Sequence, residues 1–203
     1  MTALILVRHG ESEWNREGRV QGQFDSPLTE IGVIQAKSVS RYLSGVLLKK
    51  PLRIYTSPLE RASETASIIA EELQYPKEKI IIEQRLNDFN LGIIAGTYGW
   101  DKVAEMYPNL ARMRLQDPLR FHPPGGECGA DFEARLRSFL DDLQDDGITN
   151  LLVSHGIVNK FIRGIRRNLK GEEIIALGES QDTIYCLDHE QEKEINLARE
   201  NTE

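Results

Sequence analysis

Short apolar runs alternate along this chain with longer segments in which apolar residues recur every three or four positions. Four runs have the length and β-branched content of buried strands: they are residues 3–7, 52–56, 79–83 and 150–154. The intervals show the spacing of amphipathic helices: they are residues 32–47, 59–73, 132–143 and 158–169. Alternation over 182–188 predicts one more strand. This order predicts an α/β fold, a three-layer α/β/α sandwich with a mostly parallel central sheet and one antiparallel edge strand.

The length and composition predict one domain over residues 1–203. The chain is 40% hydrophobic and 28% charged, as is ordinary for a soluble globular protein. Thr29 is expected to cap the first long helix. The irregular segment at about 95–126 has two interpretations, a surface excursion with one helix or a lid that determines substrate specificity. The charged segment at about 190–203 is expected to be a solvated or frayed tail.

Charge and cysteine content limit the classes of partner. The net charge of −7 argues against nucleic-acid and membrane partners, so an anion site has to be a local cluster of Arg and His. Cys128 and Cys186 have no metal-ligand or redox spacing, which indicates reduced thiols and a cytoplasmic location. The first residues lack the basic leader of a signal peptide, and no run is long enough to cross a membrane. A homodimer is compatible with the sequence.

Polar and charged residues follow each of the four predicted strands. In an open α/β sheet, ligands bind outside the carboxyl ends of the parallel strands, so these residues are expected to meet at one rim. In chain order they are Arg8, His9, Gly10 and Asn15, then Ser57 and Arg61, then Asp88, and finally His155 and Gly156.

Two arginines and two histidines at one rim predict a pocket for a dianion such as phosphate. Guanidinium groups match phosphate oxygens in bidentate fashion, and Gly156 at a helix start adds backbone N–H donors. Phosphoryl transfer depends mostly on positioning and charge neutralisation, so fixed cations can replace a metal, and no cofactor is expected. A neutral histidine can act as the nucleophile. A lone His at a strand end is more often structural, whereas the four together favour catalysis; His122 and His189 are interpreted as surface residues.

At this point the sequence resembles the histidine phosphatase superfamily, the phosphoglycerate mutase-like group. The segments that carry the resemblance occur in the family's order: they are RHGESEWN, GQFDSPLTEIGVIQA, YTSPLERASETA, PPGGE and VSHGIV. The resemblance implies that His9 becomes phosphorylated while Arg8, Arg61 and His155 bind the phosphoryl group. It also implies that Asn15 is a further phosphate contact and that Ser57 supports His9 from behind.

The sequence departs from the family's pattern at a few positions. The family's proton donor is usually Glu, whereas RLNDFNLG places Asp88 there; Glu83 is a weaker candidate because it lies inside a predicted strand. Ile93 and Ile94 replace a polar–aromatic pair, and Cys128 stands where Ser is common. These replacements bear on the substrate more than on the chemistry.

The sequence therefore predicts a metal-independent hydrolase of small-molecule phosphomonoesters that acts through a phosphohistidine on His9, with Asp88 as the proton donor. The compact segment before PPGGE favours the phosphatase branch. Two alternatives stay open. One is a phosphoglycerate mutase, in which Arg112, Arg114 and Arg120 hold a substrate carboxylate. The other is a non-catalytic phosphate-binding protein on the same fold.

Overall fold

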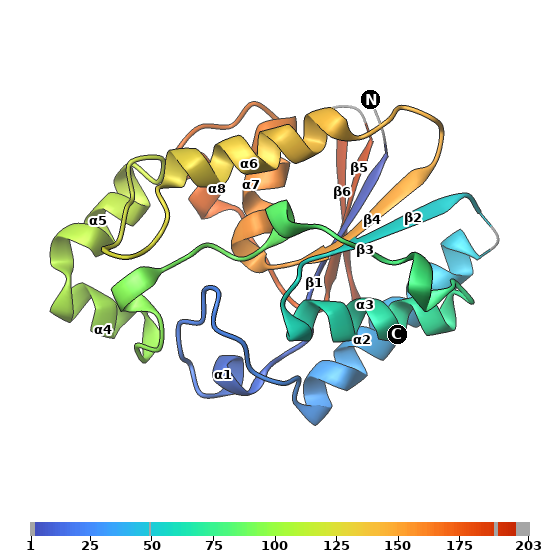
Figure 1. The fold of residues 1–203 in the computed structure, drawn as a ribbon, viewed down its shortest axis with the longest axis horizontal. Coiled ribbons are helices and arrows are strands. Elements are labelled where there is room, and N and C mark those ends of the chain that lie inside the picture. Colours follow the sequence, from blue (N-terminus) through green and yellow to red (C-terminus); the bar gives the residue numbers. More distant parts are fainter. Residues whose placement is uncertain (1–2, 49, 189–190, 198–203) are drawn as a thin grey trace.

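The computed structural model describes residues 3–48, 50–188 and 191–197, and its centre is a sheet with the strand order β3-β2-β4-β1-β5-β6 (Figure 1). The six strands, in chain order, are β1 Leu4–Arg8, β2 Leu52–Thr56, β3 Ile81–Ile82, β4 Thr149–Ser154, β5 Thr183–Asp188 and β6 Gln191–Asn196. β1, β2, β3 and β4 pair in parallel, and β5 runs antiparallel to both β1 and β6. The mostly parallel sheet with one antiparallel strand is confirmed.

Helices cover both faces of the sheet. The eight α-helices of the described chain are α1 Glu13–Arg16, α2 Glu30–Leu47, α3 Glu60–Glu72, α4 Gly99–Met106, α5 Pro108–Gln116, α6 Gly129–Asp142, α7 Gly156–Arg166 and α8 Glu172–Ala176. α2 and α3 lie on one side, and α6 and α7 on the other (Figure 1). Successive side chains of β1 point to opposite faces, so Leu4 and Leu6 pack in one core and Ile5 and Val7 in the other. The predicted α/β/α layers are thus present.

The start of α2 is held directly beneath the end of β1. Thr29 accepts a hydrogen bond from the Gly32 N–H, as predicted for its cap. A Cβ on Gly10 would lie 2.2 Å from the Gly32 carbonyl oxygen, and one on Gly32 would lie 2.0 Å from the Glu11 oxygen. Only glycine permits this approach of the two backbones. The glycine after His9 therefore lets helix α2 pack against the rim of the sheet.

Two predicted strands differ from the structure. The run 79–83 was expected to be buried, but only Ile81–Ile82 is a strand, and these side chains are 40% and 62% exposed at the sheet edge. Glu83 lies outside that strand, at the cap of the short 3₁₀ helix Gln84–Leu86, and binds Arg85. β5 was expected at the edge, yet β6 pairs with its outer side.

The charged tail is also corrected in part. Residues Gln191–Asn196 form β6, and Ile195 and Leu197 are buried, so this part of the predicted 190–203 tail belongs to the sheet. Residues 190 and 198–203, and His189, lie outside the described residues.

The segment 95–126 contains two helices, α4 and α5, rather than one. Both lie at one end of the molecule, beyond the carboxyl ends of the strands (Figure 1). In the part of the chain that is described, no helix is long and apolar enough to cross a membrane.

Candidate active site

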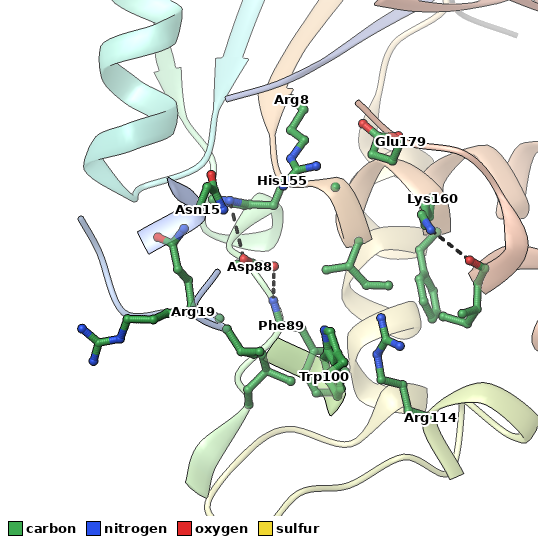
Figure 2. Close-up of a pocket in the computed structure, with 18 of the residues that line it drawn as sticks. Arg8, Asn15, Arg19, Asp88, Phe89, Trp100, Arg114, His155, Lys160 and Glu179 are labelled. Carbon is green, nitrogen blue, oxygen red and sulfur yellow. Dashed lines mark hydrogen bonds and ion pairs between the residues drawn. The ribbon is translucent and has the colours of Figure 1, made fainter. Parts of the chain in front are cut away.

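A cavity of about 400 Å³ opens at the carboxyl ends of β1 and β4. Residues from all the predicted positions except Ser57 and Gly10 line it: they are Arg8, His9, Asn15, Arg61, Asp88, His155 and Gly156. The opposite wall comes from α4, α5, α7 and the loop after α5, including Trp100, Arg114, Phe121 and Lys160. Figure 2 shows Arg8 and His155 on one side of this space and Trp100 and Arg114 on the other.

His9 is held as a neutral imidazole with a defined proton. It follows β1, and its backbone N–H continues the ladder by donating to the Ser154 oxygen at 2.9 Å. Its Nδ1 lies 2.7 Å from the Gly10 carbonyl oxygen, which can only accept, so Nδ1 carries the proton. Burial, with the positive charges of Arg61 and Arg8, lowers the pKa of His9 well below its usual value. Nε2 is therefore an unprotonated nitrogen at the cavity.

Arg61 is fully buried in the first turn of α3, and its five N–H groups have five acceptors. Nε donates to His9 Nε2 at 3.3 Å, and Nη2 donates to Asp88 Oδ2 at 3.1 Å. The remaining acceptors are the Phe24 and Gly22 carbonyl oxygens, both at 2.8 Å, and Asp25 Oδ1 at 3.1 Å. Arg61 thus holds His9 and Asp88 in place, and a phosphoryl oxygen can bind it only by replacing one of these acceptors.

Arg8 and His155 each present a nitrogen that no described residue satisfies. Arg8 Nε and His155 Nδ1 are buried and lack a hydrogen-bond partner. The two imidazole rings are 5.2 Å apart, and burial, followed by the charge of Arg61, lowers the pKa of His155 well below its usual value. Leaving buried polar atoms unpaired is costly, and such atoms in a cavity point to a ligand that satisfies them.

Ser57 was expected to support His9, but its Oγ lies 2.7 Å from His155 Nε2. The reason is the strand order: β4 lies between β2 and β1, so the end of β2 meets the end of β4 first. The Ser57 backbone N–H donates to the Val153 oxygen of β4 at 3.1 Å. Ser57 therefore orients the second histidine and not the first.

The Asp88 side chain is 15% exposed, and its carboxyl has a raised pKa. Burial raises the pKa of Asp88 and outweighs the opposite effect of the Arg61 charge. Its Oδ1 accepts from the Phe89 N–H at 2.8 Å, and its Oδ2 lies 3.7 Å from His155 Nδ1. A carboxyl that holds its proton more strongly is a better candidate for a general acid.

Asn15 and Gly156 lie at the rim as expected. The Asn15 side-chain oxygen accepts from the Ser12 N–H at 3.2 Å and from the Gln181 side-chain amide at 3.0 Å. His155 is the N-cap of α7, so the Gly156 N–H lies at the positive end of that helix. A Cβ on Gly156 would lie 3.2 Å from Glu179 Cγ, so the glycine leaves room for the Glu179 side chain.

Several other candidates lie outside the cavity lining. Among Arg112, Arg114 and Arg120, only Arg114 lines it; Arg112 binds Asn109, and Arg120 pairs with Asp117 at the surface. His122 is exposed, as predicted. Ile93, Ile94 and Cys128 also lie outside the lining, and neither cysteine is in a disulfide. Over the described ranges, no three His, Cys, Asp or Glu side chains are placed to hold a metal ion.

The cavity is completed by three residues that the sequence did not single out: Trp100, Lys160 and Glu179. The Arg114 guanidinium carbon lies 3.8 Å from the centre of the Trp100 ring, and Lys160 donates to the Ile175 oxygen at 2.9 Å. The Glu179 side chain is only 3% exposed, and burial raises its pKa to about 7. It accepts from the Asn159 side-chain amide at 2.9 Å. Lys160 alone had a sequence signal, because it lies one helical turn after Gly156 and so on the same face of α7.

Comparisons of the sequence and the fold with known proteins identify relatives of this chain. A metal-independent phosphoserine phosphatase from Arabidopsis thaliana is 34% identical over 166 residues, which is 80% of this chain and 67% of that one. A protein named "Probable phosphoglycerate mutase GpmB", from Escherichia coli O1:K1 / APEC, is 36% identical over 159 residues, 77% of this chain and 71% of that one. The structure of mycobacterial glucosyl-3-phosphoglycerate phosphatase with VO3 has a TM-score of 0.81 and 25% identity, covering 97% of this chain and 98% of that one.

The profile of the histidine phosphatase superfamily, branch 1, matches residues 4–202. This span includes both histidines, both arginines and Asp88 of the cavity rim. The chain belongs to the histidine phosphatase superfamily.

Proposed function

We propose that this protein hydrolyses phosphomonoesters without a metal, through a phosphohistidine on His9. The observation that carries the proposal is an unprotonated His9 Nε2 at a cavity in which Arg8 Nε and His155 Nδ1 are buried nitrogens without a hydrogen-bond partner. These groups suit a nucleophile facing a phosphoryl group. The names of the relatives, two phosphatases among them, agree with this reaction class.

Binding places the phosphoryl oxygens against the unsatisfied donors. Arg8, His155 Nδ1 and the Gly156 N–H hold the oxygens, and Asn15 adds an amide N–H. Arg61 supplies a positive charge next to His9, from which its Nε is 3.3 Å away. These fixed cations neutralise the charge that a metal ion would otherwise balance.

In the first step, the His9 Nε2 lone pair is released from the hydrogen bond donated by Arg61 Nε and forms a bond to phosphorus, and the bond to the leaving oxygen breaks. The ring becomes positively charged, and the hydrogen bond from Nδ1 to the Gly10 oxygen, 2.7 Å long, stabilises that charge. Asp88 gives its proton to the leaving oxygen. The negative charge of the bound phosphoryl group raises the pKa of Asp88 further. Asp88 therefore still carries its proton when the leaving oxygen needs one.

In the second step, water attacks the phosphohistidine. Asp88, now ionised, accepts a proton from that water as it attacks phosphorus. The nitrogen–phosphorus bond breaks, inorganic phosphate leaves, and His9 returns to the neutral form.

A phosphoglycerate mutase is the second candidate function. The relative from Escherichia coli carries that name, and Arg114 lines the cavity where it can meet a substrate carboxylate. In a mutase, the phosphoryl group on His9 returns to the bound acid rather than to water. The two reactions share the first step and differ in the acceptor.

The test follows products from a panel of metabolite phosphates, with 3-phosphoglycerate included and with or without a bisphosphorylated primer. The proposal predicts free phosphate as the dominant product, inhibition by vanadate and an unchanged rate after prolonged chelator treatment. Conversion of 3-phosphoglycerate to 2-phosphoglycerate with little phosphate release would favour the mutase. Loss of activity that magnesium or zinc restores would contradict the metal-independent mechanism.

A further inference from the structure

A buried carboxyl that the proposed mechanism does not use lies beside the phosphoryl site. Glu179 follows α8 and lines the cavity, and its side chain is only 3% exposed. Two donors from α7 hold its carboxyl: Asn159 donates to Oε1 at 2.9 Å, and Arg163 Nη1 donates to Oε2 at 3.3 Å. Arg163 is itself paired with Glu192 of β6 at 2.6 Å. Glu179 therefore cannot turn away from the cavity without breaking both contacts.

Glu179 and Arg8 pack over the same glycine. A Cβ on Gly156 would lie 3.2 Å from Glu179 Cγ and 3.5 Å from Arg8 Cζ. Figure 2 shows Arg8 and Glu179 at the same end of the cavity. Burial lowers the pKa of Arg8, and the charge of Glu179 opposes this effect more strongly than that of Asp88. Glu179 therefore balances the charge of the arginine whose Nε has no hydrogen-bond partner.

The charge of Glu179 changes near neutral pH. The charged and titratable groups that face it come from four elements: they are Arg8 of β1, Lys160 and Arg163 of α7, Tyr185 of β5 and, through Arg163, Glu192 of β6. Burial raises the pKa of Glu179 to about 7, although the Asn159 hydrogen bond and the positive charges oppose it. Burial also raises the pKa of Tyr185 to about 12, so this phenol stays neutral where Glu179 titrates.

We propose that Glu179 balances the Arg8 charge when no anion is bound, and that it takes up a proton from solvent when a phosphoryl dianion binds. The proposal rests on the proposed function for the place of the dianion, and it adds the residue that sets the pH range of binding. A dianion and an ionised carboxylate beside one arginine repel each other, so the dianion raises the pKa of the carboxyl. Protonation removes this repulsion. Ionised Glu179 conversely weakens the binding of phosphate, which favours its release as the product.

The experiment uses sulfate as the probe, because sulfate remains a dianion near neutral pH, whereas phosphate titrates there. Titration calorimetry at constant ionic strength, in two buffers of different ionisation enthalpy, gives both Kd and the number of protons taken up. For the wild type at pH 7, we expect about half a proton per sulfate, since about half of Glu179 is already protonated. Kd should rise roughly 5- to 10-fold between pH 6 and pH 8.

Glu179→Gln should abolish the proton uptake, and at pH 8 it should bind sulfate roughly 5- to 10-fold more tightly than the wild type. Loss of a residue with a purely structural role would not increase the affinity. Glu192→Gln is the matched control, because Glu192 also binds Arg163 but lies outside the cavity lining. This variant should still take up a proton on binding sulfate, and circular dichroism checks that both variants fold.

The wild type alone can overturn the proposal. Sulfate binding with no proton uptake and a constant Kd would reject it, even if the protein is an active phosphatase. Proton uptake that persists in Glu179→Gln would assign the proton to another group, such as His155, and would also reject it. Absence of sulfate binding at every pH would remove the anion site itself. Proton uptake that only Glu179→Gln abolishes supports the proposal, even if no phosphomonoester is hydrolysed.

Discussion

The two ends of the cavity are built in different ways. At the strand end, the side chains follow β1, β2 and β4, and they bind one another: Arg61 alone has five acceptors. At the helix end, Arg114 contacts an aromatic ring, and Lys160 has one backbone acceptor. The first end is a fixed polar network, and the second is an apolar wall with two unpaired charges.

This difference indicates which end of the cavity determines the reaction and which end determines the selectivity between substrates. Donors and charges that are fixed before the reaction can stabilise a transition state without rearranging, so changes at the strand end should lower turnover of every substrate. Changes at the helix end should alter the discrimination between leaving groups. The following predictions test this division.

The largest effect is expected at the strand end, from Asp88→Asn. An alkyl leaving group needs a proton, so its hydrolysis should fall about 10²–10⁴-fold, the range of general acid catalysis. p-Nitrophenolate needs almost none, so the burst of phenolate from p-nitrophenyl phosphate should fall much less. Stopped-flow kinetics with both esters measures the contrast.

Glu83→Gln is the control for Asp88→Asn, because Glu83 binds Arg85 and lies outside the cavity lining. It should leave both rates near those of the wild type. Equal losses of the two burst rates in Asp88→Asn would remove Asp88 from the proton-donor role.

An intermediate effect is expected at Glu179, whose charge acts on both Arg8 and Lys160 and which therefore lies between the two ends. Its folded-state pKa is about 7, raised from 4.5 by burial, so the folded protein binds the proton more tightly than the unfolded chain. The stability that this proton binding contributes is fully present below the pKa of Glu179 in the unfolded chain. It is lost as the pH rises through the pKa of Glu179 in the folded protein. Over that window, the free energy of unfolding should fall by about 3 kcal/mol.

Urea denaturation at several pH values measures this fall, and Glu179→Gln should flatten it because Gln does not titrate. Glu172→Gln, on the exposed start of α8, is the matched control and should keep the wild-type slope. An unchanged slope in Glu179→Gln would show that another group titrates in this window.

The smallest effect is expected at the helix end, from Trp100→Leu. Loss of the ring under the Arg114 guanidinium should raise KM for an ester with a charged tail by about 2- to 30-fold, the value of a cation–π contact. kcat should change little, since no reacting atom is near. Trp100→Phe keeps a ring and should show a smaller rise; a fall in kcat for all esters would place Trp100 with the catalytic network instead.

The strand end was predictable because its signals are local and its geometry is general. A parallel strand buried on both faces reads as an apolar run, and residues after such runs meet at one rim. Runs of that kind preceded His9 and His155, and the structure places both histidines at the cavity. The partner of Ser57 was not predictable, because it depends on β4 lying between β2 and β1.

The helix end and the sheet edge were not predictable for a related reason. β6 carries the charged residues Glu192, Lys193 and Glu194, which suit a sheet edge. These charges make the strand difficult to recognise in the sequence, and it forms only by pairing with β5. The position of Trp100 and Arg114 depends on how α4 and α5 fold over the rim. Glu179 follows α8 in irregular chain, where no periodic pattern marks a buried carboxyl.

The most direct test of the account is the identity of the phosphorylated residue. Brief mixing with labelled phosphomonoester, followed by an alkaline quench, should trap label on the protein that is stable to base and labile to acid, as a phosphohistidine is. Peptide mapping should place it on His9, and His9→Ala should lose both label and turnover. Label that persists in His9→Ala, or that maps to His155, would contradict the account.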